Sequence, residues 1–365
     1  MRERVWNFSA GPGTLPTGVL ERARDELLAL PGVGASILEI SHRSPAFEAV
    51  ISEAEANLRE LLRIGDEHHV LFLQGGASLQ FAMVPMNLLG EADASAAYVV
   101  TGSWGQKALA EARTQRGAVT VAWDGATTGF TAVPDLGALD LDGAAYVHVT
   151  SNETIEGVEF PEAFEPDVTT LVCDASSDFL SRPIAVDRYA LLYAGAQKNA
   201  GPAGLTIAIV RDDALQRIPE GLPTMLDYRT FVRSHSVYNT PPVFSIYVLM
   251  LVTRWIRDQI GGLDRMRAIN LEKASTLYRA IDESDGFYRG HAAPEARSKM
   301  NVTFRLPSEE LEAAFVARAA ELGMVELAGH RSVGGIRASI YNAMPIEGVH
   351  ALRDFMERFR RAPER

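Results

Sequence analysis

The sequence predicts an α/β fold: a large domain with a mostly parallel sheet flanked by helices, followed by a smaller α+β domain at the C-terminus. Two observations carry this prediction. Short apolar runs alternate with helical patterns as far as residue 211, which is typical of a parallel sheet with helices on its faces. Near residue 245 the character changes to long helices with few strands. We therefore expect domains at 1–265 and 266–365, with an N-terminal segment that could pack with the small domain.

The elements of the large domain follow in order along the chain. Apolar residues at helical spacing predict helices at 18–30, 47–64 and 106–117, and a further apolar helix after Ser78. Short apolar runs predict strands at 68–74, 96–102, 144–150, 169–175, 191–197 and 205–211. Because neighbouring parallel strands need a crossover, usually a helix, this alternation agrees with the predicted sheet.

In the C-terminal part, the apolar pattern predicts long helices and one strand. Helices are expected at 243–262, 269–284, 308–323 and 347–361, and a strand at 300–307. A cleft between two domains is the usual place for a ligand, so we expect the functional site there.

Composition indicates a globular protein that does not bind nucleic acid or span a membrane. The 365 residues are 47% hydrophobic, and the net charge of −12 at pH 7 argues against a broad nucleic-acid surface. No window reaches the roughly 18 apolar residues that a membrane helix needs, and the first twenty residues contain no signal-peptide core. We expect a cytoplasmic location. The single cysteine, Cys173, lies in an apolar run and is interpreted as a buried small hydrophobe rather than a nucleophile.

Lys198 is the first candidate for chemistry. It lies in YAGAQKNAGPAG, residues 193–204, between two strand-like runs and among small residues. A lysine near apolar groups loses solvation of its charged form, so its pKa falls and the free amine can form a Schiff base with a carbonyl. The alternative is a loop lysine that points to water.

Asp174 is the second candidate, at the end of the apolar run LVCD and 24 positions (198 − 174) before Lys198. Ligands of open α/β sheets bind at the carboxyl ends of the strands. A carboxylate there needs a cationic partner. In enzymes that use pyridoxal 5′-phosphate (PLP), an Asp stabilises the protonated ring nitrogen while a Lys holds the aldehyde. The alternative is an N-cap for the segment ASSDFL.

A Gly-Gly turn and a tryptophan extend this set. The strand 68–74 breaks into Gly75, Gly76, Ala77 and Ser78 before a helix pattern, so free backbone N–H groups could bind a phosphate. The spacing matches neither a Walker loop nor GxGxxG, so nucleotide binding is disfavoured. Trp104 could stack on a planar ring or belong to the core.

Five basic residues near Gly-rich turns or other cations form the fourth signal: His42, Arg43, His330, Arg331 and Arg337. Arginine pairs bidentately with carboxylates and phosphates. Any one of these residues alone reads as a surface residue, whereas together they suit a substrate with two anionic ends.

Seven segments of the chain together resemble the phosphoserine aminotransferase family, of class V and fold type I among PLP enzymes. They are NFSAGPGTLP (7–16), EISHRS (39–44), SNETIEGVEF (151–160), DASSDFLSRP (174–183), YAGAQKNAGPAG (193–204), YNTPPVF (238–244) and GHRSVGGIRASIYNAMP (329–345). The resemblance covers almost the whole chain and implies a fold-type I PLP-transferase.

The resemblance also implies roles for the cofactor residues. Lys198 would form the Schiff base with PLP, and Asp174 would face the ring nitrogen. The other residues would stack on the ring (Trp104), bond its phenolic oxygen (Thr154), or hold its phosphate (Ala77, Ser78 and Gln197). Asn239 and Thr240 would reach the cofactor phosphate of a neighbouring subunit, which implies a homodimer with shared active sites.

The implied substrates are L-glutamate and 3-phosphohydroxypyruvate. Arg337 would bind the α-carboxylate, and the remaining cations the distal carboxylate or phosphate (His42, Arg43, His330 and Arg331). The reaction would be a reversible ping-pong transamination that yields O-phospho-L-serine and 2-oxoglutarate in serine biosynthesis. The 4-phosphohydroxythreonine step of vitamin B6 biosynthesis stays open as a second use, as does another class V activity.

The chain departs from the family pattern in one loop, which reads GGASLQF at 75–81. One branch of the family carries an Arg there, in the pattern GGGRGQF, so this chain lacks one cation on the substrate side. Three other functions stay as alternatives: a cysteine desulfurase, which would require Cys173 to be a mobile nucleophile; a Schiff-base lyase or aldolase without cofactor; and an inactive dimeric interaction protein.

Overall fold

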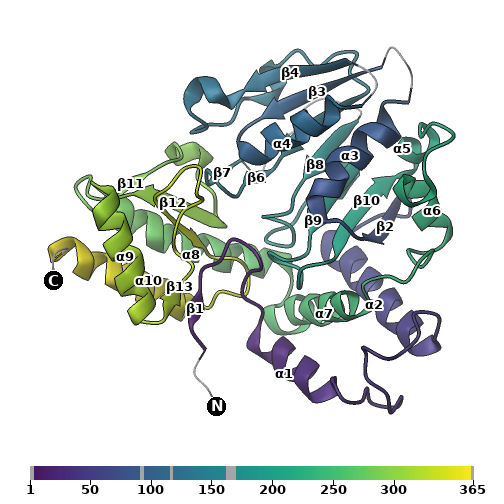
Figure 1. Ribbon diagram of the computed structural model, residues 1–365, viewed down its shortest axis with the longest axis horizontal. Helices are drawn as coiled ribbons and strands as arrows, with labels where there is room; N and C mark the ends of the chain where they lie inside the picture. The colour runs from purple at the N-terminus through teal and green to yellow at the C-terminus, as the bar shows by residue number, and fades with distance from the viewer. Residues whose placement is uncertain (1–3, 91–93, 116–117, 162–169, 363–365) are drawn as a thin grey trace.

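The computed structural model describes residues 4–90, 94–115, 118–161 and 170–362. Its centre is a seven-stranded sheet in the order β2-β10-β9-β8-β5-β3-β4 (Figure 1). These strands are β2 (His68–Leu73), β3 (Ser95–Val100), β4 (Ala118–Asp124), β5 (Tyr146–Thr150), β8 (Leu171–Asp174), β9 (Leu191–Gly195) and β10 (Thr206–Arg211). β10 runs antiparallel to β2 and β9, and the other neighbouring pairs of this sheet are parallel. The mostly parallel sheet flanked by helices is therefore confirmed.

Helices cover both faces of this sheet because successive side chains of a buried strand point to opposite sides. In β2, Val70 and Phe72 join one core cluster, whereas Leu71 and Leu73 join another. The first cluster includes α1 (Thr17–Glu26), α2 (Pro45–Leu62) and α7 (Val243–Arg254). The second includes α3 (Gly76–Leu88), α4 (Ser103–Ala112), α5 (Asp212–Gln216) and α6 (Tyr228–Arg233).

A third core belongs to the C-terminal elements. It packs α8 (Leu263–Asp282), α9 (Glu309–Glu321) and α10 (Ile346–Arg361) around the sheet β11-β12-β14. These antiparallel strands are β11 (Arg289–Gly290), β12 (Asn301–Arg305) and β14 (Ile336–Ser339). The N-terminal strand β1 (Trp6–Asn7) pairs with β13 (Met324–Val325), and Phe8 is buried in the same core (Figure 1).

Short elements complete the description. A two-stranded sheet pairs β6 (Asn152–Glu153) with β7 (Val158–Glu159). The 3₁₀ turns are η1 (Gly125–Thr128), η2 (Leu136–Ala138), η3 (Val186–Arg188), η4 (Thr224–Leu226) and η6 (Pro294–Ala296), and η5 (Trp255–Ile260) is a π-helix that continues α7. No helix in the described ranges has both the length and the apolar character that a bilayer crossing requires.

Several predicted boundaries were wrong. Helix α1 ends at Glu26 instead of residue 30, because the N–H of the C-cap residue Leu27 bonds to the carbonyl oxygen of Arg24, which tightens the last turn and ends the α-helical pattern. Helix α8 begins at Leu263 instead of 269, because its first turn is amphipathic. The predicted helix 106–117 spans Ser103–Ala112, and residues 116–117 lie outside the described part. Strand β4 was missed, since it lies at the sheet edge and is largely exposed.

Candidate active site

The parallel strands bring the chemical candidates to one edge of the large sheet. Asp174 ends β8, and Thr150 and Tyr193 pair with it from the two neighbouring strands. Lys198 follows the end of β9, and α4 begins just after β3 (Figure 1). Because the carboxyl ends of parallel strands meet at one edge, residues far apart in the sequence become neighbours there.

Lys198 is buried with its amine near one hydroxyl. The side chain is 9% exposed, and Nζ donates a hydrogen bond of 2.7 Å to Oγ1 of Thr154. Burial lowers the pKa of Lys198 to about 8, although the charges of Asp174 and Glu153 oppose this shift. The interpretation of Lys198 as a loop lysine that points to water is therefore wrong. An amine with this pKa is partly neutral near physiological pH, as a nucleophile or general base requires.

Asp174 is also buried, at 4% exposure. Its Oδ1 accepts a 2.9 Å hydrogen bond from the Ser176 backbone N–H, in a turn. No helix begins in the residues that follow it up to Val186, so the N-cap interpretation is wrong. Burial raises the pKa of the Asp174 carboxyl, and the positive charge of Lys198 counteracts this. Asp174 and Lys198 are thus a carboxylate and an amine that are both buried and that influence each other electrostatically.

Two buried glutamates that the sequence reasoning missed hold the start of α4. Oε2 of Glu153 accepts from the Trp104 N–H at 2.9 Å, and its Oε1 accepts from the Gly105 N–H at 2.8 Å. Oε1 of Glu156 accepts from both the N–H and the hydroxyl of Ser103. Burial raises the pKa of Glu153, and the charge of Glu156 adds to the shift. The only sequence signal was the three closely spaced glutamates of the segment NETIEGVEF, Glu153, Glu156 and Glu159.

Trp104 is positioned by these contacts beside Lys198. The Nζ of Lys198 lies 5.6 Å from the centroid of the Trp104 ring. The Nζ of Lys107 lies 3.9 Å from the same centroid, a cation that the sequence analysis did not identify. The indole Nε1 is buried and has no hydrogen-bond partner among the described residues. The indole N–H therefore remains for a hydrogen bond to a ligand next to the amine of Lys198.

Gly102 is required where these glutamates meet α4. A Cβ atom at Gly102 would lie 2.6 Å from Cδ of Glu153 and 2.6 Å from Oε2 of Glu156. Gly102→Ala should therefore lower the free energy of unfolding by about 1–3 kcal/mol through overpacking. Urea unfolding would measure this change. The matched control is Gly18→Ala in α1, where a Cβ meets nothing within 4 Å, and a helical Ala should be neutral or stabilising. Equal stability of both variants would contradict the expectation.

The first turn of α3 is open to an anion, in contrast to α4. Its N-cap, Gly75, has φ 89° and provides no side-chain cap, and the first turn contains no acidic residue. Gly76 also has a positive φ, of 65°. Ala77 and Ser78 follow in this turn, so backbone N–H groups and one hydroxyl are left for a phosphate.

Three more residues were predicted to bind the phosphate: Gln197, Asn239 and Thr240. Nδ2 of Asn239 contacts Oε1 of Gln74 at 3.4 Å, next to Gly75. Thr240 is exposed, and Gln197 is partly buried beside Gly195. A Cβ at Gly195 would lie 2.6 Å from Oε1 of Gln197, so the glycine makes room for this amide.

The structure brings His330 and Arg337 together and separates His42 and Arg43 from them. Burial lowers the pKa of Arg337, whereas the charge of Glu156 raises it. Burial also lowers the pKa of His330, and the charge of Arg337 contributes. Arg331 is exposed next to His330.

His42 and Arg43 line a different cavity of about 460 Å³, together with Glu48, Glu55 and His235. Nε of Arg43 lies 3.4 Å from Nε2 of His42. Neither Lys198 nor Asp174 lines this cavity. Within one chain, these two cations therefore do not join the other candidate residues.

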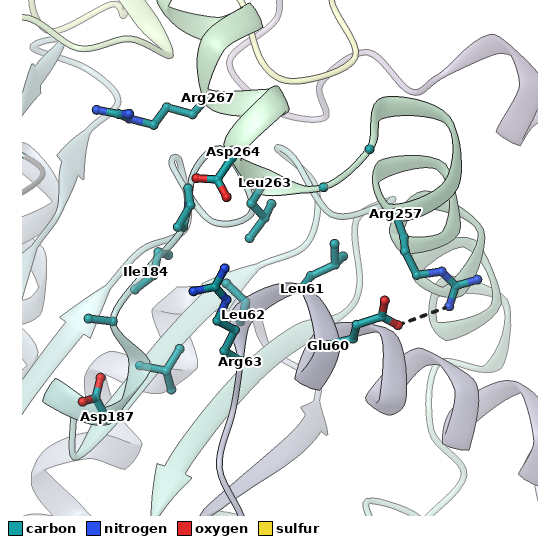
Figure 2. A pocket seen from close by; sticks show the side chains of 15 residues that line it. Glu60, Leu61, Leu62, Arg63, Ile184, Asp187, Arg257, Leu263, Asp264 and Arg267 are labelled. Carbon is teal, nitrogen blue, oxygen red and sulfur yellow. Dashed lines mark ion pairs between the residues drawn. The ribbon is translucent and has the colours of Figure 1, made fainter.

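A larger cavity of about 780 Å³ contains none of the predicted site residues (Figure 2). It lies between the end of α2, residues 183–187 and the start of α8. Its wall combines Arg63, Arg257 and Arg267 with Glu60, Asp187 and Asp264. Arg257 and Glu60 approach each other to 3.8 Å. Because the wall carries both positive and negative side chains, this cavity shows no preference for an anionic or a cationic ligand.

Cys173 is fully buried in β8, and burial raises the pKa of its thiol well above the ordinary value. Reactive cysteines are accessible thiolates, so the interpretation as a buried small hydrophobe is confirmed. A mobile catalytic cysteine, as in a desulfurase, does not fit this position.

The residues around Lys198 suit a ligand with three groups. Lys198 can take an aldehyde, Asp174 a protonated ring nitrogen, and the uncapped turn of α3 a phosphate. The unpartnered indole N–H of Trp104 and Nε of Arg337 are further buried donors without partners among the described residues. Such donors are normally satisfied in a native protein, so they indicate that a polar ligand completes the pocket.

Comparison with known proteins gives a consistent result. The profile of the family Aminotransferase class-V matches residues 5–352. A phosphoserine aminotransferase of Rhodopirellula baltica is 54% identical over 98% of this chain and 95% of that protein. One of Geobacillus kaustophilus is 54% identical over 98% and 99%.

Solved structures are similar over the whole chain. The phosphoserine aminotransferase from Bacillus circulans subsp. alkalophilus has a TM-score of 0.95 and 51% identity, covering 99% of each chain. A PLP-bound phosphoserine aminotransferase from Trichomonas vaginalis has a TM-score of 0.90 and 39% identity, covering 97% of this chain and 100% of the other.

Proposed function

The chain belongs to the class-V aminotransferases, and from this premise we propose that it is a phosphoserine aminotransferase. Its cofactor is PLP, as the family and the PLP-bound relative imply. The observation that carries the proposal is the buried pair of Lys198 and Asp174 beside Trp104 and the uncapped turn of α3. Neither a cofactor-free aldolase nor an inactive interaction protein needs this complete set.

The proposed cofactor residues each have one task. When bound, PLP supplies an electron sink for the negative charge that develops at the substrate α-carbon. Lys198 moves the proton at that carbon, because its lowered pKa keeps part of the amine neutral. Asp174 would pair with the protonated ring nitrogen, and Trp104 would stack on the ring.

The remaining proposed cofactor contacts orient the same group. Thr154, which accepts the hydrogen bond from Lys198, would also bond the phenolic oxygen. The phosphate is assigned to the first turn of α3 with Ala77, Ser78 and Gln197. A helix N-terminus suits this dianion because its N–H groups and dipole both favour negative charge.

The proposed substrates are L-glutamate and 3-phosphohydroxypyruvate, with 2-oxoglutarate and O-phospho-L-serine as products. Arg337 would bind the α-carboxylate that both substrates share, and His330 and Arg331 would meet the distal carboxylate or phosphate. One basic pocket can therefore serve both half-reactions. Lys107 adds a cation on this side, where the loop GGASLQF lacks the Arg of one family branch.

We also propose that the enzyme is a homodimer with shared active sites. His42 and Arg43 lie apart from Lys198 within one chain, so they can meet its substrate only if a second chain supplies them. The segment before them exposes Leu28 at 88% and Leu38 at 63%. Exposed apolar residues that gather in one segment favour a protein interface. Asn239 and Thr240 are assigned to the partner's cofactor phosphate because the family resemblance implies this role.

A hybrid dimer tests the shared site. A Lys198→Ala chain and an Arg43→Ala chain should each form weakly active homodimers. In the hybrid, one of the two sites combines an intact Lys198 with an intact Arg43, so about half of the wild-type rate should return. Steady-state rates of the purified hybrid would measure this. A hybrid no more active than its parents would show that both residues act within one chain.

Substrate rates test the function itself. The purified protein should absorb visible light through bound PLP and should use 3-phosphohydroxypyruvate about 100-fold more efficiently than hydroxypyruvate, because unpaired basic groups penalise the smaller acid. Equal efficiencies would contradict the proposed substrate. The longer phosphorylated keto acid of vitamin B6 biosynthesis forms a second assay, which decides whether the pocket accepts this additional substrate.

Two further proposals concern the domain boundary and the cellular location of the protein. We propose domains at 1–265 and 266–365; the separate core around β11, β12 and β14 supports this division. We propose a cytoplasmic location, for which the single buried Cys173 is consistent with a chain that needs no disulfide.

A further inference from the structure

Lys273 of α8 is a buried cation held by backbone carbonyls. Its side chain is 0% exposed, and Nζ lies 2.9 Å from the carbonyl oxygen of Ile340, 2.7 Å from that of Tyr341, 3.4 Å from that of Asn342 and 3.3 Å from that of Met344. No carboxylate in the described part of the chain forms an ion pair with it. Burial lowers the pKa of Lys273 to about 7, while four carbonyl dipoles favour retention of its proton.

The turn 340–344 connects the small domain to the lysine loop of the large domain. The backbone N–H of Asn342 donates to Oδ1 of Asn199 at 2.9 Å, and Asn199 directly follows Lys198. Nδ2 of Asn342 donates to the carbonyl oxygen of Leu180 at 2.8 Å. The Tyr341 hydroxyl donates to the carbonyl oxygen of Ala10 at 2.8 Å. The turn thus contacts the Lys198 loop, the segment after Asp174 and the N-terminal segment.

The carbonyl arrangement itself favours a positive charge, and of the four oxygens that of Tyr341 also accepts a hydrogen bond from the Met344 backbone N–H at 2.9 Å. Four carbonyl oxygens that point at one position repel each other, and a buried carbonyl without a partner is costly. Carbonyl cages of this kind replace the hydration shell of potassium in proteins. An ammonium group has a full charge and three N–H donors, so it can fill the same cage from within the chain.

We propose that Lys273 is a positioning residue whose ammonium group serves as a built-in monovalent cation. It holds the turn 340–344 in the conformation that bonds Asn199, and so fixes the backbone that carries Lys198. The activity part of this inference rests on the proposed transamination. Small misplacements of a reacting group are expensive, since about 1 Å can cost roughly 100-fold in rate.

Lys273→Ala tests the cage because it leaves space for an external cation. In tetramethylammonium chloride, which is too large to enter, kcat should fall at least about tenfold. Ammonium chloride or potassium chloride at the same ionic strength should restore several-fold activity. Lys273→Met should lose activity without recovery, because its side chain fills the cage. Lys299→Ala is the control: this lysine faces Glu159, with Nζ to Oε1 3.5 Å, and its activity should not respond to the choice of cation.

Two further measurements separate positioning from general stability. The pH at which the visible absorbance of bound PLP changes should shift in folded, cofactor-loaded Lys273→Ala and return towards the wild-type value in ammonium. Asn199→Ala should show the same spectral shift with no response to cations. If Lys273→Ala unfolds in tetramethylammonium, its thermal midpoint should rise in ammonium.

The possible results are distinct. No cation response of activity, spectrum or thermal midpoint in Lys273→Ala would overturn the cage. A cation response of the thermal midpoint with a wild-type spectrum would overturn the positioning role. A wild-type protein that fails to transaminate 3-phosphohydroxypyruvate, while Lys273→Ala still shows the cation-dependent spectrum, would refute the proposed function and leave this inference standing.

Discussion

Lys198→Ala should lower kcat by at least about 10⁴-fold, the upper range for removal of a general acid–base group. The variant keeps the rest of the pocket but lacks the amine that takes the aldehyde and moves the proton. The visible absorbance of the purified protein should also disappear or shift, because the covalent link to PLP is lost. Stopped-flow turnover and an absorbance scan measure the two effects.

The matched control for this variant is Lys107→Ala. Lys107 lies over the same Trp104 ring, but its amine is not the buried one that bonds Thr154. Its loss should raise KM for the phosphorylated substrate and leave the visible absorbance in place. Normal turnover in Lys198→Ala, or loss of the absorbance in Lys107→Ala alone, would refute the assignment of Lys198.

Asp174→Ala should have the second largest effect on activity and should reduce kcat by about 10²–10³-fold. The carboxylate is placed to keep the ring nitrogen protonated, and electrostatic groups in dry sites commonly contribute factors of this size. Its negative charge also raises the pKa of Lys198. The pKa of Lys198 should therefore fall below about 8 in Asp174→Ala.

The rate of PLP uptake by the apoprotein measures the second part of this prediction. Uptake requires the neutral amine, so the pH of half-maximal rate should follow the pKa of Lys198 and move down in the variant. Asp178→Asn is a useful comparison, since Asp178 lies in the same buried region but has a smaller effect on Lys198. An unchanged or raised midpoint in Asp174→Ala would contradict the electrostatic pairing of Asp174 with Lys198.

The sequence predicted most elements and the principal pair of the site. Periodicity identified the strands that surround Asp174 and Lys198, because residues buried on both faces of a sheet form short continuous apolar runs. The small residues around Lys198 predicted the close approach of a flat ligand or a tight backbone turn. The exact ends of α1 and α8 were wrong, since helix termini depend on local capping and on packing against other elements.

Residues that act through long-range contacts were not predictable in this way. Glu153 and Glu156 looked like ordinary acidic residues, and only the fold places them at the start of α4 beneath Trp104. Lys273 looked like one polar position of an amphipathic helix. Its role depends on carbonyl groups about 70 residues away, which no helical pattern can reveal.

The sequence by itself determined the fold class, the candidate lysine and its carboxylate, because local hydrophobic patterns reveal buried strands and their alternation with helices. The tertiary structure alone decided which cations share a pocket. It joined His330 and Arg337 near Glu156 and placed His42 and Arg43 in another cavity. The physical reason is that electrostatic interactions depend on distance and burial in space, and neither is set by separation along the chain.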